Sequence, residues 1–251
     1  MTISAIKPII LLVGTIFLIS ASVWAEEFSK NDKWHFELKP LYFWSLSLEG
    51  DTTMEPAKGG PGGTSNLDEA ELTSAFSLHF EAGKGDWTVF TDYLYAQYTA
   101  NDINISTSPV QGNNELTAHL AELGVAYLLS DESWYKLEIL GGVRYMYIEN
   151  KFDFYNDNLN TLSANGNVWD GFGGIRLTGI MTDSLTATVR ADVGGGNSDL
   201  VWNAVALVNW RYLHWGSIFA GYRVLDYKVS NGPLAFDLQA KGPVIGLSFH
   251  W

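Results

Sequence analysis

The sequence predicts an all-β chain that folds as an antiparallel, up-and-down transmembrane β-barrel of ten strands, with eight as the alternative count. Three observations predict it. Residues 244–251 alternate strictly between apolar side chains on one face and small or polar side chains on the other, which is the period of a strand. Tyrosines and tryptophans stand at the ends of such segments, as they do where strands leave a bilayer. The chain also begins with the pattern of an export signal.

Residues 1–25 are laid out as a secretory signal peptide. Lys7 precedes an apolar run at 9–19, and Val23 and Ala25 supply the small residues of a cleavage site. About a dozen apolar residues are too few for a retained anchor helix, the alternative, because a helical span needs about twenty. We therefore expect a signal peptide at 1–25, a short periplasmic segment at 26–33 and the barrel at 34–251.

Composition excludes several classes of protein. The 251 residues include no cysteine, which removes disulfides, thiolate metal sites and cysteine nucleophiles. A net charge of −13 argues against a nucleic-acid partner. No second apolar run approaches the length of a membrane helix, so the sequence excludes a helical bundle in the inner membrane.

Ten segments alternate with a period of two residues and are separated by turn or loop composition. The clearest lies at 134–149, where an apolar face has tyrosines at both rims. Short connections alternate with long polar ones through most of the chain, which places the termini and tight turns in the periplasm and the long acidic loops outside. The predicted strands are 34–48, 70–83, 87–100, 115–129, 134–149, 166–180, 185–194, 199–212, 215–229 and 234–251.

The polar faces of these strands carry equal numbers of acids and bases. Unpaired charges inside a narrow barrel would be costly, so we expect a pairing network that largely fills the lumen. A narrow channel for small solutes or ions is the alternative. The predicted lumen acids are Glu37, Glu81, Asp92, Glu122, Glu138, Asp170, Asp192 and Asp237, and the bases are Lys39, Lys136, Arg144, Arg176, Arg190, Arg211, Arg223 and Lys241.

The opposite faces carry the rings that we expect to lie at the two membrane surfaces. A soluble sandwich or lipocalin-like barrel would also alternate, but it has no reason to rim one apolar face with aromatics at both ends. The predicted girdle residues are Trp44, Tyr135, Tyr145, Trp169, Trp202, Trp210, Tyr222 and Trp251.

Catalysis is the second alternative, because small outer-membrane barrels include proteases and lipid A acyl hydrolases. His79 stands two residues from Glu81 and predicts a satisfied lumen pair, whereas His119 has the phase of a lipid-facing residue. No nucleophile, base and orienting group can be assembled from these positions. We expect no enzyme, no cofactor and no metal site.

One irregularity is predicted in the last strand. Its first half places Leu238 outward and Asp237, Gln239 and Lys241 inward, opposite in phase to the second half. A permissive glycine and a proline without an N–H, at 242–243, suit a β-bulge that would join the two phases.

Several blocks of sequence resemble a widespread group of uncharacterised Gram-negative outer-membrane β-barrel proteins, loosely akin to the OmpA-like transmembrane barrels. They are GGVRY at 141–145, WD at 169–170 with GIR at 174–176, RADVGG at 190–195 before DLVW at 199–202, GYRVLDY at 221–227 and GPVIGLSF at 242–249. The similarity runs from about residue 39 to 251 and departs at PLYFW, 40–44. The resemblance implies location and fold, and it brings no activity or catalytic residue.

Location in the outer membrane implies partners. We expect outer-membrane lipid and lipopolysaccharide around the barrel, and recognition of the last strand by the barrel-assembly machinery. We expect a monomer with periplasmic termini.

Overall fold

The computed structural model describes residues 33–40, 42–44, 47–54, 63–66, 70–104, 111–155, 161–230 and 234–251. The predicted signal peptide and nearly all of the segment 26–33 lie outside these residues. No helix long and apolar enough to cross a membrane occurs within the described ranges. The strands are β1 (His35–Lys39), β2 (Tyr42–Trp44), β3 (Ser47–Met54), β4 (Gly63–Asn66), β5 (Glu71–Lys84), β6 (Trp87–Asn104), β7 (Gln111–Asp131), β8 (Tyr135–Phe154), β9 (Leu162–Thr182), β10 (Leu185–Gly196), β11 (Leu200–Leu213), β12 (Gly216–Val229) and β13 (Leu234–His250).

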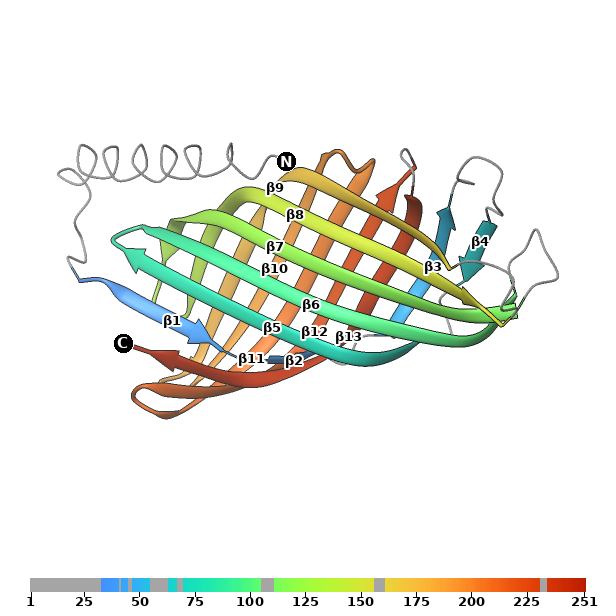
Figure 1. The fold of residues 1–251 in the computed structure, drawn as a ribbon. Helices are drawn as coiled ribbons and strands as arrows, with labels where there is room; N and C mark the ends of the chain where they lie inside the picture. The colour runs from blue at the N-terminus through green and yellow to red at the C-terminus, as the bar shows by residue number, and fades with distance from the viewer. Residues whose placement is uncertain are drawn as a thin grey trace, which may run out of the picture.

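The strands form a closed antiparallel barrel (Figure 1). Each strand from β5 to β13 pairs with the next one along the chain, and β1 pairs with both β5 and β13, which closes the wall. β1, β2 and β3 share the first position of a ten-strand wall, and β4 is an extra strand that pairs with β3. The predicted architecture and strand count are confirmed.

The strands on the loop side are longer than the sequence pattern predicted. β6 and β7 pair as far as Asn104 with Gln111, and β8 and β9 pair as far as Phe152 with Leu162. β3 and β4 form a ladder inside the predicted loop 49–69. These regions looked like loops because they are polar, but polar side chains do not prevent a strand whose outer face lies in water.

The exterior carries a continuous apolar band. Its exposed members include Val89, Leu123, Ile139, Ile175, Leu177, Val189, Val208, Ile218, Ile245 and Leu247. Exposed rings rim the band on the turn side, among them Trp87, Trp134, Trp210, Trp215 and Trp251. On the loop side the rings of Tyr145 and Trp169 pack with centroids 4.7 Å apart.

The rims are spaced for a bilayer. Tyr135 and Tyr145 both face outward on β8, and ten residues of strand rise about 33 Å, or about 25 Å along the membrane normal once the strand is tilted. That height is the apolar band of a transmembrane barrel. Of the predicted girdle, Tyr135, Tyr145, Trp169, Trp202, Trp210, Tyr222 and Trp251 lie on the outer side.

Trp44 corrects the girdle prediction, because it lies inside the barrel and is 3% exposed. The cause is a shift of register in the first strand. β1 pairs Glu37 with His250, whereas β2 pairs Trp44 with Val244. Seven residues of the first strand thus span only six residues of β13, so the register shifts by one residue between the two ladders. One extra residue turns every following side chain to the opposite face.

β13 corrects the predicted bulge. It pairs with β12 in one unbroken register, from Val229 with Phe236 to Gly216 with Phe249, straight through residues 242–243. Leu238 therefore faces inward and is buried, and Asp237 faces outward. The strand needs no bulge, because residues 234–241 lie beyond the apolar band, where polar side chains can face outward.

Candidate functional site

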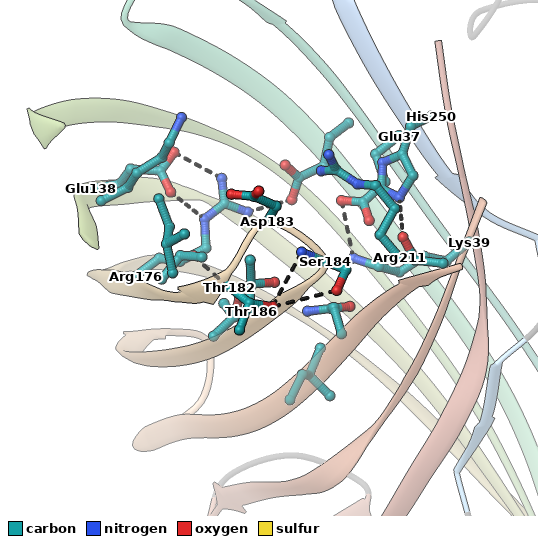
Figure 2. A pocket seen from close by; sticks show the side chains of 18 residues that line it. Glu37, Lys39, Glu138, Arg176, Thr182, Asp183, Ser184, Thr186, Arg211 and His250 are labelled. Carbon is teal, nitrogen blue, oxygen red and sulfur yellow. Dashed lines mark hydrogen bonds and ion pairs between the residues drawn. The ribbon is translucent and has the colours of Figure 1, made fainter. Parts of the chain in front are cut away.

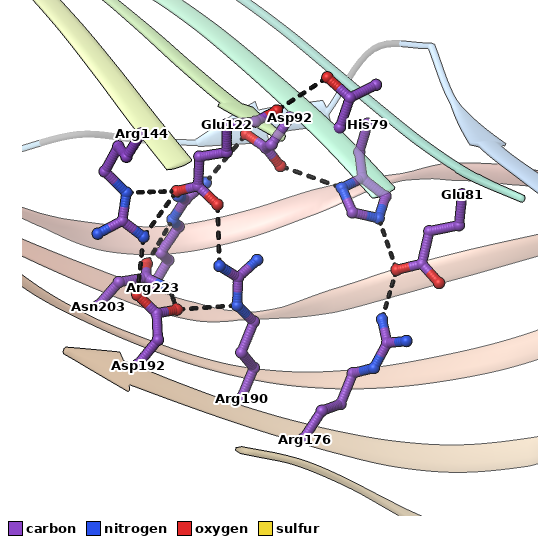
Figure 3. A network of polar contacts seen from close by, with 11 residues as sticks. His79, Glu81, Asp92, Glu122, Arg144, Arg176, Arg190, Asp192, Asn203 and Arg223 are labelled. Atoms are coloured by element: carbon purple, nitrogen blue, oxygen red, sulfur yellow. Dashed lines mark hydrogen bonds and ion pairs between the residues drawn. The ribbon is translucent and has the colours of Figure 1, made fainter. Parts of the chain in front are cut away.

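The middle of the lumen is filled by a ring of buried charges (Figure 3). Arg144 of β8 has no exposed surface; its Nε donates to Glu122 Oε1 at 2.9 Å and its Nη2 to Asp192 Oδ1 at 2.7 Å. Arg190 of β10 donates to the other oxygens of the same two carboxylates, each at 2.8 Å. Two guanidinium groups and two carboxylates thus alternate around a ring, which satisfies charges that would be costly alone.

Arg223 of β12 joins this ring. Its Nε donates to Asn203 Oδ1 at 3.0 Å, and Asn203 Nδ2 donates to Asp192 at 2.9 Å. Arg223 also stands 3.5 Å from both Glu122 and Asp92. We call Glu122, Arg144, Arg190, Asp192 and Arg223 the central charge layer.

Aromatic faces cover the guanidinium groups of this layer. Arg144 lies over Phe172 at 4.8 Å, Arg190 over Phe90 at 5.0 Å, and Arg223 over Trp44 at 4.9 Å. Stacking on a ring leaves the edge of a guanidinium free to donate hydrogen bonds in its plane. Each guanidinium group is therefore packed against an aromatic ring through its face and hydrogen-bonded through its edge.

A second branch of the network runs toward the turn side. His79 faces Asp92 Oδ2 at 3.2 Å through Nδ1 and Glu81 Oε1 at 3.0 Å through Nε2. Because ionised carboxylates only accept hydrogen bonds, both ring nitrogens must carry a proton for both contacts to be hydrogen bonds. Glu81 also binds Arg176, which in turn makes a two-pronged pair with Glu138 at 2.6 and 2.9 Å.

Apolar side chains occupy the lumen on the loop side of the central charge layer and leave a cavity of only about 50 Å³ among them. Phe152 and Val201 have no exposed surface, and Ile148, Leu116 and Tyr227 are 1% exposed. Asn150 is buried among them and donates to Thr52 Oγ1 at 2.8 Å across the lumen. We call this the apolar layer; it consists of Leu48, Leu94, Ala96, Tyr98, Leu116, Leu120, Met146, Ile148, Phe152, Val168, Val201, Leu225, Tyr227, Val229, Phe236 and Leu238.

The turn side of the lumen is hollow instead. A polar vestibule of about 420 Å³ opens there (Figure 2). Threonine hydroxyls of β9 and β10, with Ser184 in the turn between them, line one part of its wall, and Glu37, Lys39 and Arg176 line another. A smaller cavity of about 90 Å³, the inner chamber, lies between the vestibule and the central charge layer.

The structure brings most of the predicted lumen residues together. Asp92, Glu122, Arg144, Arg190, Asp192 and Arg223 meet in or beside the central charge layer, and Glu81, Glu138 and Arg176 form the turn-side branch. Glu37, Lys39, Lys136 and Arg211 line the vestibule. Asp170 is buried and accepts from the Ser198 backbone N–H at 2.9 Å, closer to the loop side.

Two predicted lumen residues are on the outside of the wall. Asp237 pairs with Lys228 at 3.1 Å, and Lys241 pairs with Glu49 at 2.5 Å. Both follow from the single phase of β13, which turns odd-numbered residues outward. They contribute to an aqueous outer surface, and the prediction that they lie in the lumen is wrong.

Sequence reasoning missed the residues that support the charges. Asn203 bridges Arg223 and Asp192, and Phe90 and Phe172 pack on the guanidinium groups. A signal for Asn203 was present, because its phase on the strand pointed inward. No pattern along the chain identifies Phe90 and Phe172 as stacking partners, since alternation alone does not show what lies across the lumen.

The histidines do not form a catalytic arrangement. The ring nitrogens of His79 both face carboxylates, so neither is left to take a proton from a nucleophile. His119 lies on the outer face, where Tyr93 Oη is 2.9 Å from its Nδ1. His250 Nε2 lies 2.9 Å from Ser217 Oγ, but Glu37, the acid beside it in the ladder, is engaged by Ser248 and Lys39. Within the described residues, no group of three possible ligands could hold a metal ion.

The fold and the lumen together define a transmembrane β-barrel of the outer-membrane class. No protein-family profile and no curated sequence matches this chain. Among solved structures, the translocator domain of the autotransporter NalP from Neisseria meningitidis is similar at 12% identity and a TM-score of 0.47, covering 95% of this chain and 96% of that one.

Two further barrels are similar to a comparable degree. The outer membrane protein OprG from Pseudomonas aeruginosa has 12% identity and a TM-score of 0.41, covering 88% of this chain and 97% of that one. Ail, the attachment invasion locus protein of Yersinia pestis, has 9% identity and a TM-score of 0.40, covering 87% and 99%. Likeness at this level carries no argument about function, which must come from the residues of this chain.

Proposed function

We propose that this protein is an integral outer-membrane barrel that is structural, non-enzymatic and closed to ions. The observation that carries the proposal is the succession of two packed layers across one lumen, the second with a cavity of only about 50 Å³. The central charge layer contains Arg144 and Glu122, whose side chains have no exposed surface, and the apolar layer lies directly beyond it.

Each layer opposes conduction for a different reason. A permeating ion would have to displace a charge from pairs that are already matched, which leaves the displaced partner buried and alone. Beyond them it would meet a mainly apolar interior whose few oxygens, such as those of Tyr98, Tyr227 and Asn150, cannot replace a full hydration shell.

The same proposal places the protein in its membrane. The apolar exterior would contact outer-membrane lipid and lipopolysaccharide, with the turn side and both termini in the periplasm. The aromatic last strand would be recognised by the barrel-assembly machinery, and the protein would act as a monomer. Labelling a cysteine placed at Glu132 or at Asn197 with a membrane-impermeant reagent on intact cells tests the orientation. We expect labelling at 197, in the β10–β11 connection, and none at 132 in a turn; the reverse result would overturn the orientation.

Conductance in planar bilayers tests closure. Folded protein, identified by heat-modifiable migration in detergent, should give no steps above the baseline while a general porin inserted in the same bilayer gives large ones. Regular steps from the folded species would overturn closure and favour the alternative, a narrow channel, for which the hollow vestibule is the supporting observation.

Overexpression tests the non-enzymatic part. We expect unchanged lipid A and uncleaved surface peptides. Altered lipid A or cleaved peptides that return to normal with His79→Ala or His119→Ala would contradict it.

A further inference from the structure

The inner chamber is placed where a small molecule can enter from one side only. The two cavities adjoin, because five side chains line both of them: Lys39, Glu81, Arg176, Thr188 and Leu207. On its far side the chamber is bounded by Arg190 and Arg223 of the central charge layer. Its volume of about 90 Å³ exceeds what one water molecule needs.

The charges of the lining are unbalanced. Glu81 and Asp92 are its two carboxylates, whereas its cations number four, an excess of two before His79 is counted. Four acids outside the lining compensate these cations, because Glu37 pairs with Lys39 and the acids Glu122, Asp192 and Glu138 bind the arginines. The four cations are Lys39, Arg176, Arg190 and Arg223.

Two of these cations retain donors that can reach a ligand. Lys39 Nζ carries three N–H groups and makes one ion pair, with Glu37 at 3.2 Å. Arg190 uses Nε and Nη2 toward Asp192 and Glu122, which leaves Nη1 without a hydrogen bond among the described residues. Both side chains are largely buried, so an anion between them would be held where water screens it little.

The remaining wall of the chamber is apolar except for Thr188. Val205 and Leu207 of β11, Phe219 of β12 and Val244 of β13 line it, and Phe219 and Val244 are buried. Lys39 Nζ lies 5.6 Å from the centroid of the Phe219 ring, so the cationic and apolar parts of the wall meet there.

We infer that the inner chamber binds a short-chain aliphatic carboxylate that enters through the vestibule. The carboxylate lies against Lys39 and Arg190, and the alkyl chain lies against Phe219 and Val205. An inorganic anion would leave the apolar wall facing water, and an alcohol of the same size would offer the spare N–H donors of Lys39 and Arg190 one neutral oxygen instead of two charged ones, so both bind more weakly. The volume limits the ligand to a few carbon atoms.

Isothermal titration calorimetry on the folded, full-length barrel in detergent tests this inference with four probes. Sodium butyrate should bind saturably, and 13C-labelled butyrate should shift and broaden in NMR spectra. Butanol, chloride and inorganic phosphate at the same concentrations should bind at least about tenfold more weakly. Butanol lacks the carboxylate, and the two inorganic anions lack the alkyl chain. No saturable butyrate binding, or equal binding of butanol or chloride, would overturn the inference.

A pair of matched variants locates the site. Lys39→Met removes one cation of the chamber and should weaken butyrate binding about tenfold, the value of one charge-assisted contact. Lys136→Met removes a cation that lines the vestibule but not the chamber, and should leave binding unchanged. Equal effects of the two substitutions would show that positive charge anywhere near the vestibule attracts butyrate, and would overturn the assignment of the site to the inner chamber.

A third variant keeps the test decisive if Lys39→Met does not fold. Val205→Phe fills the chamber without altering any charge and should abolish butyrate binding, with folding checked by heat-modifiable migration. Unchanged binding in this variant would overturn the inference. The site does not depend on closure: a barrel that conducts but binds butyrate would contradict the proposed function alone.

Discussion

The turn-side and loop-side halves of this barrel are opposite in character although the same strands build both. On β8, Ile139 and Tyr145 face lipid while Glu138 and Arg144 face the lumen. Further along the same strand, Glu149, Lys151 and Asp153 face outward, while Ile148 and Phe152 are buried inside. One half is built like a membrane barrel and the other like a soluble β-sandwich.

The comparison shows that the surroundings decide which face of a strand is apolar. In the membrane the outer face must be apolar, so polar groups are confined to the lumen and must pair there. Beyond the membrane the outer face meets water, and the hydrophobic effect then fills the interior with apolar side chains. The central charge layer lies where these two rules meet.

The largest expected effect is in the charged interior. Arg144→Met should lower the free energy of unfolding by about 3–5 kcal/mol, because it leaves Glu122 and Asp192 buried without one of their cationic partners. Denaturant unfolding of the barrel in phospholipid vesicles, followed by tryptophan fluorescence, measures it. The double variant Arg144→Met/Glu122→Gln removes one charge of each sign and should recover part of the loss. No recovery would mean that Arg144 acts through packing rather than charge.

The apolar interior should respond nearly as strongly but locally. Phe152→Ala should cost about 3 kcal/mol, since it empties a fully buried position. We expect faster amide exchange in the loop-side ends of β7, β8 and β9, with unchanged exchange in their turn-side ends. Phe76→Ala, at an outward-facing ring of β5, is the control and should leave amide exchange at the loop-side ends of β7, β8 and β9 unchanged. Uniform loss of protection along β8 would show that the two halves unfold as one.

The two exteriors should tolerate charge differently. Ile139→Lys, in the middle of the apolar band, should cost about 2 kcal/mol or more in vesicles, whereas Asp153→Lys on the same face of the same strand should cost almost nothing. Equal costs would mean that the band of lipid contact extends past Tyr145 and would remove the distinction between the halves.

The smallest effect is expected at the outer ion pairs of the loop-side half. Lys241→Met removes the pair with Glu49, which is half-exposed, and should change the free energy of unfolding by less than about 0.5 kcal/mol. The difference from the parent protein should shrink further at high salt. A large, salt-independent loss would place Lys241 in a dry environment instead.

Particular residues show what sequence alone can predict in such a protein. Alternation placed Tyr135, Tyr145, Arg144 and Glu122 on the correct faces, because a two-residue period fixes facing wherever the ladder is regular. It failed at Trp44, where one added residue reverses the faces without leaving a pattern in the sequence.

Two other features were beyond reach for different reasons. Asp237 was misplaced because every strand was treated as spanning lipid along its whole length, although the strands continue into water. The bonds from Arg144 to Glu122 and Asp192 join β8 to a neighbour and to a strand two positions away, and facing inward does not specify which groups meet across a lumen.

The register shift of the first strand also bears on how the barrel closes during folding. A ladder grows by adding the next pair in the same register, so the pairing of Glu37 with His250 cannot extend directly into the pairing of Trp44 with Val244. The seam between the two ends of the chain therefore consists of two ladders, one of β13 with β1 and one of β13 with β2 and β3. We expect the turn-side and loop-side parts of this seam to close as separate steps.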